Sequence, residues 1–312
     1  MTATTTGGLP VALLLPGQGS QHPRMATGLY SGEAAEPEFA AAMDEVFTAM
    51  GAAGKPLRAD WFAERPTVPV DHVTRSQPLI FAVDYALARL VMSRGVRPAA
   101  LLGHSVGEMA AAVLAGVFTL PDATALVLDR VRRLADAPPG GMLAVAAAPG
   151  ELEPYLGDDV VVGAVNAPRQ TVLAGPEAPL EKTGQALRDA LFTCRRVPSL
   201  TGFHSPMLEP ACRGAEELFA SVPVRAPRIT IHSAYTAGPL THGDVANPAY
   251  WARHPVAPVL FWPALDALLS TGDHILIETG PGDGLSRLAR RHPRVRAGTS
   301  KVLPLRATEH GP

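Results

Sequence analysis

A serine between two glycines, Ser105 in Gly103-His-Ser-Val-Gly107, is the residue of this chain best suited to nucleophilic chemistry. In a GxSxG pattern the glycines relieve crowding where a strand turns sharply into a helix, and the turn leaves the serine hydroxyl exposed. The apolar run 99–103 precedes the pattern, and a segment of helical composition, 108–115, follows it. We therefore predict that Ser105 attacks an activated carbonyl and that the backbone N–H of Val106 donates to the resulting oxyanion.

A serine hydroxyl is hardly ionised at neutral pH, so Ser105 needs a base, and the chain offers ten histidines. His104 is adjacent, but neighbouring side chains at a turn point apart, so we interpret His104 as structural. His204 stands in a short loop before Ser205-Pro206, a position from which it could face a cleft, and it is the better candidate. No two histidines have metal-ligand spacing with a supporting carboxylate, so we expect no metal site.

Alternating apolar strands and helices surround these residues and predict an α/β fold. The run 9–15 has the length of a buried parallel strand and leads into the glycine-rich turn 16–20. Helices are expected at 76–94, 122–134 and 211–220 from their apolar spacing. This order predicts a large hydrolase-like subdomain built on a parallel sheet, with the nucleophile elbow at the end of one strand.

The composition changes at Pro138-Pro139-Gly140-Gly141, which we interpret as a hinge. Four short β-like runs follow it, with helical segments between them. This pattern predicts a small, inserted α+β subdomain of the ferredoxin-like kind at 139–201. The large α/β subdomain then comprises 1–138 and 202–312.

Charge and hydropathy exclude several classes of partner and location. The net charge of -2 gives no general attraction to a phosphate backbone, so we expect no nucleic acid partner. The longest apolar run, 109–120, is shorter than the ~20 residues of a membrane span, so we expect no membrane association. Because no basic residue precedes Arg24, a signal peptide is not expected, and we predict a cytoplasmic protein. Cys194 and Cys212 are interpreted as small, reduced, buried residues.

Four motifs in order give a specific resemblance. They are Pro16-Gly-Gln-Gly-Ser-Gln21, Gly103-His-Ser-Val-Gly-Glu108, Phe203-His-Ser-Pro206 and Glu278-Thr-Gly-Pro-Gly282. Together they resemble the malonyl-CoA:acyl-carrier-protein transacylase family, which includes the acyltransferase domains of modular polyketide synthases. The resemblance extends over residues 9–306, nearly the whole chain.

The resemblance implies a role for five residues. Ser105 corresponds to the acylated nucleophile and His204 to its base, which a backbone carbonyl usually orients in this family. Gln18 corresponds to the second oxyanion donor, through its backbone N–H, beside Val106. Arg130 corresponds to the arginine that holds the free carboxylate of a malonyl group in a two-pronged salt bridge.

The resemblance also implies residues around the acyl group. Gln77 matches a position that lines the acyl pocket, and Asn166 matches one at the subdomain interface. Phe203 resembles the bulky residue of malonyl-selective members, whose ring leaves less room for an α-methyl branch. Two positions depart from the family pattern, since Leu260 stands where Gln or Arg is usual and Val131 where Gly is common. The identity of the acyl group therefore stays open, although Arg130 favours a carboxylated one.

The implied substrates are an acyl-CoA donor and the phosphopantetheine of an acyl carrier protein, with no cofactor besides them. Carrier proteins are acidic, and five arginines lie in 287–296. We expect Arg287, Arg290 and Arg291 to form part of a docking face for the carrier. The pathway is expected to be polyketide synthesis, with fatty acid synthesis as the alternative.

Three other functions share these residues. The chain could transfer an aminoacyl or peptidyl group from one carrier protein to another. It could be an editing hydrolase that strips acyl groups from carriers, although no Asp or Glu partner for His204 stands out and Arg130 argues against an ordinary hydrolase. A carrier-binding module without catalysis is the third, and the intact pair of Ser105 and His204 disfavours it.

Overall fold

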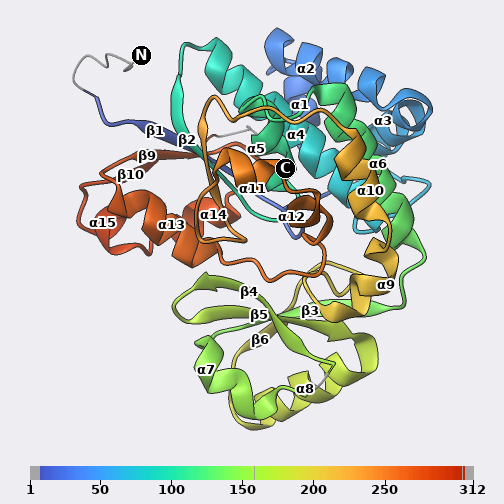
Figure 1. Cartoon of the computed structure of the whole chain (residues 1–312), viewed down its shortest axis with the longest axis vertical. Helices are drawn as coiled ribbons and strands as arrows, with labels where there is room; N and C mark the ends of the chain where they lie inside the picture. The colour runs from blue at the N-terminus through green and yellow to red at the C-terminus, as the bar shows by residue number, and fades with distance from the viewer. Residues whose placement is uncertain (1–7, 158, 304, 306–312) are drawn as a thin grey trace.

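A six-stranded sheet forms the centre of the larger part of the chain in a computed structural model, which describes residues 8–157, 159–303 and 305 (Figure 1). Its strand order is β10-β9-β1-β2-β7-β8, and the first five strands run parallel while β8 pairs antiparallel with β7. The strands are β1 (Val11–Leu15), β2 (Pro98–Gly103), β7 (Thr230–Ser233), β8 (Gly238–Pro239), β9 (Ile275–Glu278) and β10 (Lys301–Leu303).

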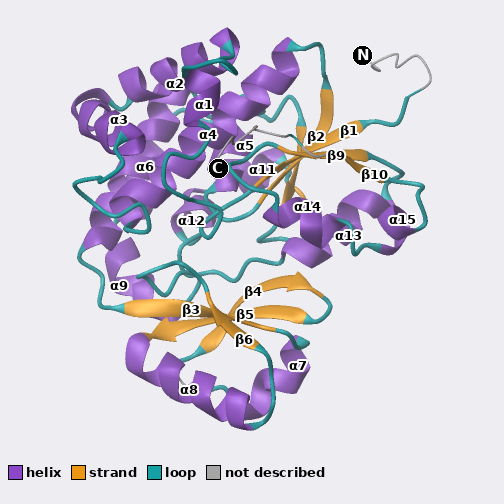
Figure 2. Cartoon of the chain, turned by 180° about the vertical axis from the view of Figure 1, so that it is seen from behind, coloured by secondary structure: helices purple, strands orange, loops and turns teal. Residues whose placement is uncertain are grey.

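Helices cover both faces of this sheet, which explains why its strands are apolar along their whole length. Leu13 and Leu15 of β1 pack into a cluster with the helices before and after β2, whereas Ala12 and Leu14 pack on the opposite face. Figure 2 shows α2, α4, α5 and α6 on one side of the strands and α13 and α14 on the other. The core therefore lies on both sides of β1 and β2 and holds their carboxyl ends rigidly.

The helices begin and end close to the expected positions in most cases. Thr119 caps the helix that carries Arg130 by accepting from the N–H of Asp122. The α-helices are α1 (Thr27–Tyr30), α2 (Pro37–Ala49), α3 (Gly54–Phe62), α4 (Val73–Ser93), α5 (Gly107–Leu114), α6 (Leu120–Ala135), α7 (Pro149–Leu152), α8 (Glu177–Asp189), α9 (Glu209–Cys212), α10 (Ala215–Ser221), α11 (His242–Ala246), α12 (Pro248–Ala252), α13 (Phe261–Ser270), α14 (Gly284–Ala289) and α15 (Pro293–Arg296).

The single helix expected at 211–220 is wrong. Two short helices, α9 and α10, occupy this segment instead. Gly214 separates them with a φ of 74°, a left-handed backbone conformation that a continuing helix does not contain. The glycine in the sequence indicates the break between the two helices, and the apolar spacing alone does not.

A four-stranded antiparallel sheet forms the smaller part, at the bottom of Figure 1. Its strands are β3 (Gly140–Val145), β4 (Val161–Ala167), β5 (Gln170–Pro176) and β6 (Cys194–Arg196), in the order β4-β5-β3-β6. With α7 after β3 and α8 after β5, the chain follows the β-α-β-β-α-β order of ferredoxin-like folds. The predicted fold class is thus confirmed, while the boundaries at 139 and 201 stay predictions.

Short backbone contacts join the two parts near the candidate site. The N–H of Val259 donates to the Gly163 carbonyl over 2.9 Å, and the N–H of Val165 donates to the Val259 carbonyl over 2.8 Å. Strand β4 thereby contacts the segment that leads into α13. The two parts meet along this line rather than through the hinge alone.

Two expectations about the chain as a whole can be compared with the structure. Within residues 8–157, 159–303 and 305, none of the helices is long and apolar enough to cross a membrane. Cys194 and Cys212 are half-buried, so the expectation that both are buried is wrong. Cys194 opens β6 at the edge of the small sheet, and Cys212 ends the short helix α9, and both places face solvent on one side.

Candidate active site

Ser105 lies just beyond the carboxyl end of β2, where the strand turns into α5. Its φ of 56° places it in the left-handed region, which is uncommon for a residue other than glycine and is typical of a nucleophile elbow. Gly107 makes the turn possible, because a Cβ there would lie 2.1 Å from the Leu15 carbonyl oxygen. The sequence pattern thus folds as predicted, and the turn holds the hydroxyl at the carboxyl edge of the sheet.

His204 meets Ser105 across the junction of the two parts. Ser105 Oγ lies 2.9 Å from His204 Nε2, although 99 residues separate them in the chain. His204 has a φ of 64°, and its own N–H donates to the Pro255 carbonyl over 2.7 Å. The chain segment returning from the small sheet therefore places the imidazole, as expected for a base that faces the serine.

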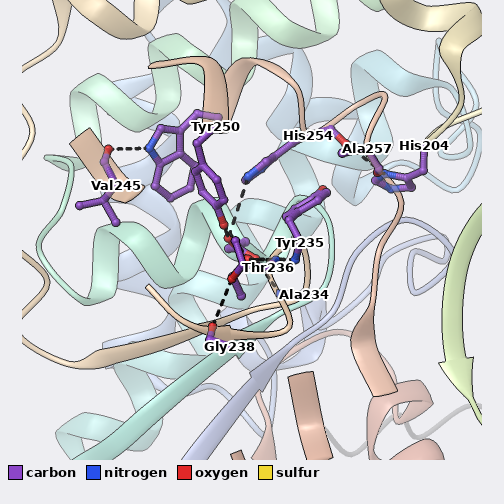
Figure 3. A network of polar contacts seen from close by, with 12 residues as sticks. His204, Ala234, Tyr235, Thr236, Gly238, Val245, Tyr250, His254 and Ala257 are labelled. Atoms are coloured by element: carbon purple, nitrogen blue, oxygen red, sulfur yellow. Dashed lines mark hydrogen bonds and ion pairs between the residues drawn. The ribbon is translucent and has the colours of Figure 1, made fainter. Parts of the chain in front are cut away.

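Two backbone carbonyls orient the His204 ring. Nδ1 lies 3.0 Å from the His254 carbonyl oxygen and 2.9 Å from that of Ala257, so this nitrogen carries the proton and donates it (Figure 3). Nε2 is then the unprotonated nitrogen, free to accept from Ser105. The pKa of His204 is lowered to about 3, mainly by burial and also by the neighbouring His104 and Arg130, against the two carbonyl contacts.

Two backbone N–H groups are available beside Ser105. Among the described residues, the N–H groups of Gln18 and Val106 donate to no protein acceptor. Gly17 brings the first of them close, since a Cβ on Gly17 would lie 2.9 Å from the Cβ of Ser105. Two fixed donors next to a nucleophile are what an oxyanion hole requires. The structure brings both predicted residues to the elbow.

Arg130 is a buried cation that forms no ion pair with a carboxylate in the part of the chain that the structure describes. It lies on α6, and its hydrogen bond within the described part of the chain runs from Nη2 to the Trp251 carbonyl over 3.3 Å. Burial lowers the pKa of Arg130, and nearby Tyr235, Cys212 and Glu108 oppose this effect. A guanidinium stays protonated in proteins, so its remaining donors are available to an anionic ligand.

The buried carboxylate of Glu108 accepts hydrogen bonds from the loop after β7 and from α12. Its Oε2 accepts from the N–H of Ala234 over 3.2 Å, and its Oε1 accepts from the Tyr250 hydroxyl. His254 Nε2 lies 3.9 Å from Glu108 Oε1, and Figure 3 shows Ala234, Tyr250 and His254 on their segments. Burial raises the pKa of Glu108 to about 7, against these hydrogen bonds and the charge of Arg130. Glu108 therefore holds the loop after β7 to α12 through buried hydrogen bonds.

A cleft of about 500 Å³ opens between the two parts beside the elbow. Gln18 and His104 line it from the large part, and Asn166 lines it from β4. His104 Nε2 lies 3.0 Å from the Asn166 side-chain oxygen, so this pair joins the two walls. Arg287 and Arg291 line the same cleft, next to the glycine-rich turn that precedes the elbow in the sheet.

The sequence of this chain matches a known protein family over most of its length. The acyl transferase domain family matches residues 13–301. The chain belongs to the acyl transferase domain family. The resemblance predicted from the four motifs is therefore confirmed.

Known acyltransferases align over most of this one. A component of the phenolphthiocerol/phthiocerol polyketide synthase of Mycobacterium tuberculosis is 39% identical over 285 residues, which cover 91% of this chain but 19% of that protein. The acyltransferase domain from the second module of the salinomycin polyketide synthase is 36% identical, with a TM-score of 0.85 over 95% of this chain and 69% of that one. MCAT from Streptococcus pneumoniae is 25% identical, with a TM-score of 0.80 and 95% of each chain covered. This acyltransferase thus spans about a fifth of the length of its mycobacterial relative.

Other predicted residues of the acyltransferase lie around the elbow at different depths. Phe203 is buried beside His204, with 6.3 Å between the ring centres. Gln77 is buried in α4, and its Oε1 has no hydrogen-bond partner among the described residues. Arg287, Arg290 and Arg291 are all exposed. Arg287 and Arg291 line the cleft, and Arg290 does not.

Two further residues of the acyltransferase site were missed by the sequence reasoning. Tyr235 stacks on His254, with ring centres 3.9 Å apart and planes 13° apart. His254 also supplies one of the carbonyls that orient His204. No local motif marks either residue. The available signal was position, since Tyr235 follows an apolar strand at its carboxyl end, where α/β folds place their sites.

Proposed function

We propose that this acyltransferase moves a malonyl group, or a similar carboxylated extender, from CoA to the phosphopantetheine thiol of an acyl carrier protein through an ester on Ser105. The observation that carries the proposal is the hydrogen-bonded pair of Ser105 and His204 together with the buried Arg130, which has no carboxylate partner among the described residues. The pathway is polyketide synthesis in this proposal, because the curated relative with 39% identity belongs to a polyketide synthase. A cytoplasmic location stays part of the proposal.

The first half of the reaction forms the ester. His204 Nε2 takes the proton of Ser105 Oγ as the oxygen attacks the thioester carbonyl, and the N–H groups of Gln18 and Val106 hold the oxyanion. The C–S bond then breaks, and the proton passes from Nε2 to the leaving CoA sulfur. In the second half the carrier thiol gives its proton to Nε2 and attacks the ester, and Ser105 recovers its proton as it leaves. No cofactor enters this sequence.

The free carboxylate of the acyl group pairs with Arg130 in this proposal. A carboxylate matches the planar fork of a guanidinium and accepts two hydrogen bonds from it. The burial of Arg130 strengthens the pairing, because little water competes for the charge. Phe203 fills space beside His204, and this bulk favours malonyl over a branched extender.

The competing function is hydrolysis of the same ester, and the ratio of transfer to hydrolysis separates the two. The enzyme is incubated with malonyl-CoA and either a phosphopantetheinylated carrier protein or pantetheine as a small thiol. We expect malonyl thioester to form faster than free malonate with both acceptors. Malonate as the main product, with neither thiol acylated, would identify an editing hydrolase instead.

Charge reversal at Arg290 and Arg291 should weaken transfer to the carrier protein. Carrier proteins are acidic, and rim charges of this kind steer encounters, so we expect the KM for the carrier to rise about fivefold or more in the Arg290→Glu, Arg291→Glu double variant. Transfer to uncharged pantetheine should keep its wild-type rate. Arg97→Glu is the matched control, because Arg97 is exposed just before β2, at the end of the sheet opposite Ser105. Equal losses with carrier and pantetheine would contradict a docking role.

The rate of Ser105 acylation should stay nearly constant as the pH falls from about 8 to 5. His204 remains neutral, and so able to accept a proton, until the pH approaches its pKa of about 3. Because this pKa lies below the unfolded value of 6.5, acid favours the unfolded chain, so stability decreases below pH 6.5 before the base is protonated. Rapid-quench acylation rates across this range test the point. A sigmoidal loss with a midpoint near 6.5 would contradict it.

A further inference from the structure

Tyr235 lies on the strand next to the nucleophile, at the same level of the sheet. Gly103 of β2 pairs with Ser233 of β7 in the parallel register. Ser105 and Tyr235 each stand two residues beyond that pair. Parallel strands end at one edge of a sheet, so the register alone places Tyr235 beside the elbow.

The Tyr235 ring is held in place from several sides. It stacks on His254, and its centre lies 6.1 Å from that of His204 (Figure 3). The N–H groups of Tyr235 and Thr236 both donate to Ser233 Oγ, over 2.9 and 3.2 Å. These contacts fix the orientation of the Tyr235 side chain before any ligand binds.

The hydroxyl at the end of this ring differs from most buried hydroxyls. It is buried, and no group in the described part of the chain forms a hydrogen bond with it. A buried phenol usually finds a partner, and leaving one unpaired costs free energy. The neighbouring Tyr250 differs, because its hydroxyl contacts both Ser233 and Glu108. Tyr235 alone of this pair can offer its hydroxyl to a ligand.

The Tyr235 ring lies next to the base of the nucleophile and next to the segment that contacts Arg130. Tyr235 stacks on His254, whose ring lies 5.1 Å from that of Trp251, and Arg130 donates to the Trp251 carbonyl. Burial and Glu108 raise the pKa of Tyr235, against the effects of Arg130 and Ser105. The phenol remains neutral at working pH, so it keeps a proton to donate. An anionic ligand in this place meets one fixed cation and one fixed neutral donor.

We propose that the Tyr235 hydroxyl donates a hydrogen bond to the free carboxylate of the acyl group, beside Arg130, and thereby helps to select carboxylated acyl groups. The inference rests on the proposed function. A malonyl group has one carbon between its two carbonyl carbons, so a carboxylate held by Arg130 lies near the ester on Ser105. A group close to both residues is within reach of that carboxylate.

Tyr235→Phe tests the proposal, because it removes the hydroxyl and keeps the stacked ring. A hydrogen bond to a charged group is worth about tenfold or more in binding, so we expect the malonyl-CoA concentration for half-maximal Ser105 labelling to rise by about that factor. Labelling by acetyl-CoA, which has no free carboxylate, should not change. Tyr155→Phe on the small sheet side, where Tyr155 packs edge-on to Phe192, is the matched control.

The outcomes separate this proposal from the one on which it rests. If the wild type loads malonyl and Tyr235→Phe loads it with the same concentration dependence, the hydroxyl has no such role while the proposed function stands. If Tyr235→Phe loses malonyl and acetyl labelling equally, the hydroxyl acts on the nucleophile or the fold, and the proposal is overturned. If the wild type takes no malonyl at all, the proposed function fails first.

Discussion

Replacing His204 by alanine will slow acylation of Ser105 by malonyl-CoA by about 10²- to 10⁴-fold, the usual contribution of a general base. The serine hydroxyl lies 2.9 Å from Nε2, and two carbonyls keep the proton on Nδ1. Without the imidazole the proton of Ser105 must go to water, which the buried position of the pair disfavours. Single-turnover acylation followed by rapid quench and intact-mass detection gives the rate.

A second histidine variant shows whether the loss belongs to His204. His242 is exposed at the start of α11, so His242→Ala should acylate at the wild-type rate. Thermal unfolding of His204→Ala checks that the fold survives. Acylation of His204→Ala at the wild-type rate, in a folded protein, would remove His204 from the chemistry and leave Ser105 without a base.

Replacing Arg130 by alanine will reverse the preference between malonyl and acetyl groups. We expect malonyl labelling of Ser105 to fall by about a hundredfold or more, because a buried carboxylate loses its paired cation. Acetyl labelling should stay equal or rise, since the acetyl group carries no charge and does not need the cation. Competition between equimolar malonyl-CoA and acetyl-CoA, read as the ratio of the two adduct masses, measures the reversal.

Two neighbouring substitutions make this result specific. Arg130→Lys keeps the charge but loses the planar fork, so it should restore part of the malonyl preference and not all of it. Arg132→Ala should leave the preference unchanged, because Arg132 is exposed on the same helix and pairs with Asp129. A malonyl preference that survives in Arg130→Ala would show that the carboxylate is bound elsewhere.

The sequence allowed the chemistry at the elbow to be predicted because its determinants are local. Ser105 and its flanking glycines lie within five residues, and close approaches such as that of Gly107 to the Leu15 carbonyl leave no room for a Cβ. Apolar spacing predicted the long helices. It failed at α10, because Gly214 interrupts the helix that the spacing predicted. His204 gained its assignment from the resemblance, since a loop histidine alone does not reveal which serine it meets.

The rest of the site depends on strand order, which no local pattern contains. Tyr235 reaches Ser105 because β7 pairs with β2 in a particular register. In the sheet order β10-β9-β1-β2-β7-β8, most neighbouring strands are not consecutive in the chain. Residues separated by more than 100 positions therefore become neighbours. The helix α2 was not predicted. Its buried Phe39, Met43 and Val46 have helical spacing, so the sequence did contain the signal for it.

The most direct test of the central claim is the mass of the intact enzyme after incubation with malonyl-CoA, followed by peptide mapping, with Ser105→Ala beside the wild type. We predict one malonyl adduct per chain, located on the peptide that contains Ser105 and absent from Ser105→Ala. Methylmalonyl-CoA and acetyl-CoA, in separate incubations, should label the same serine less. An enzyme that none of the three CoA esters acylates, or that carries the adduct on another residue, would contradict transfer from CoA through Ser105.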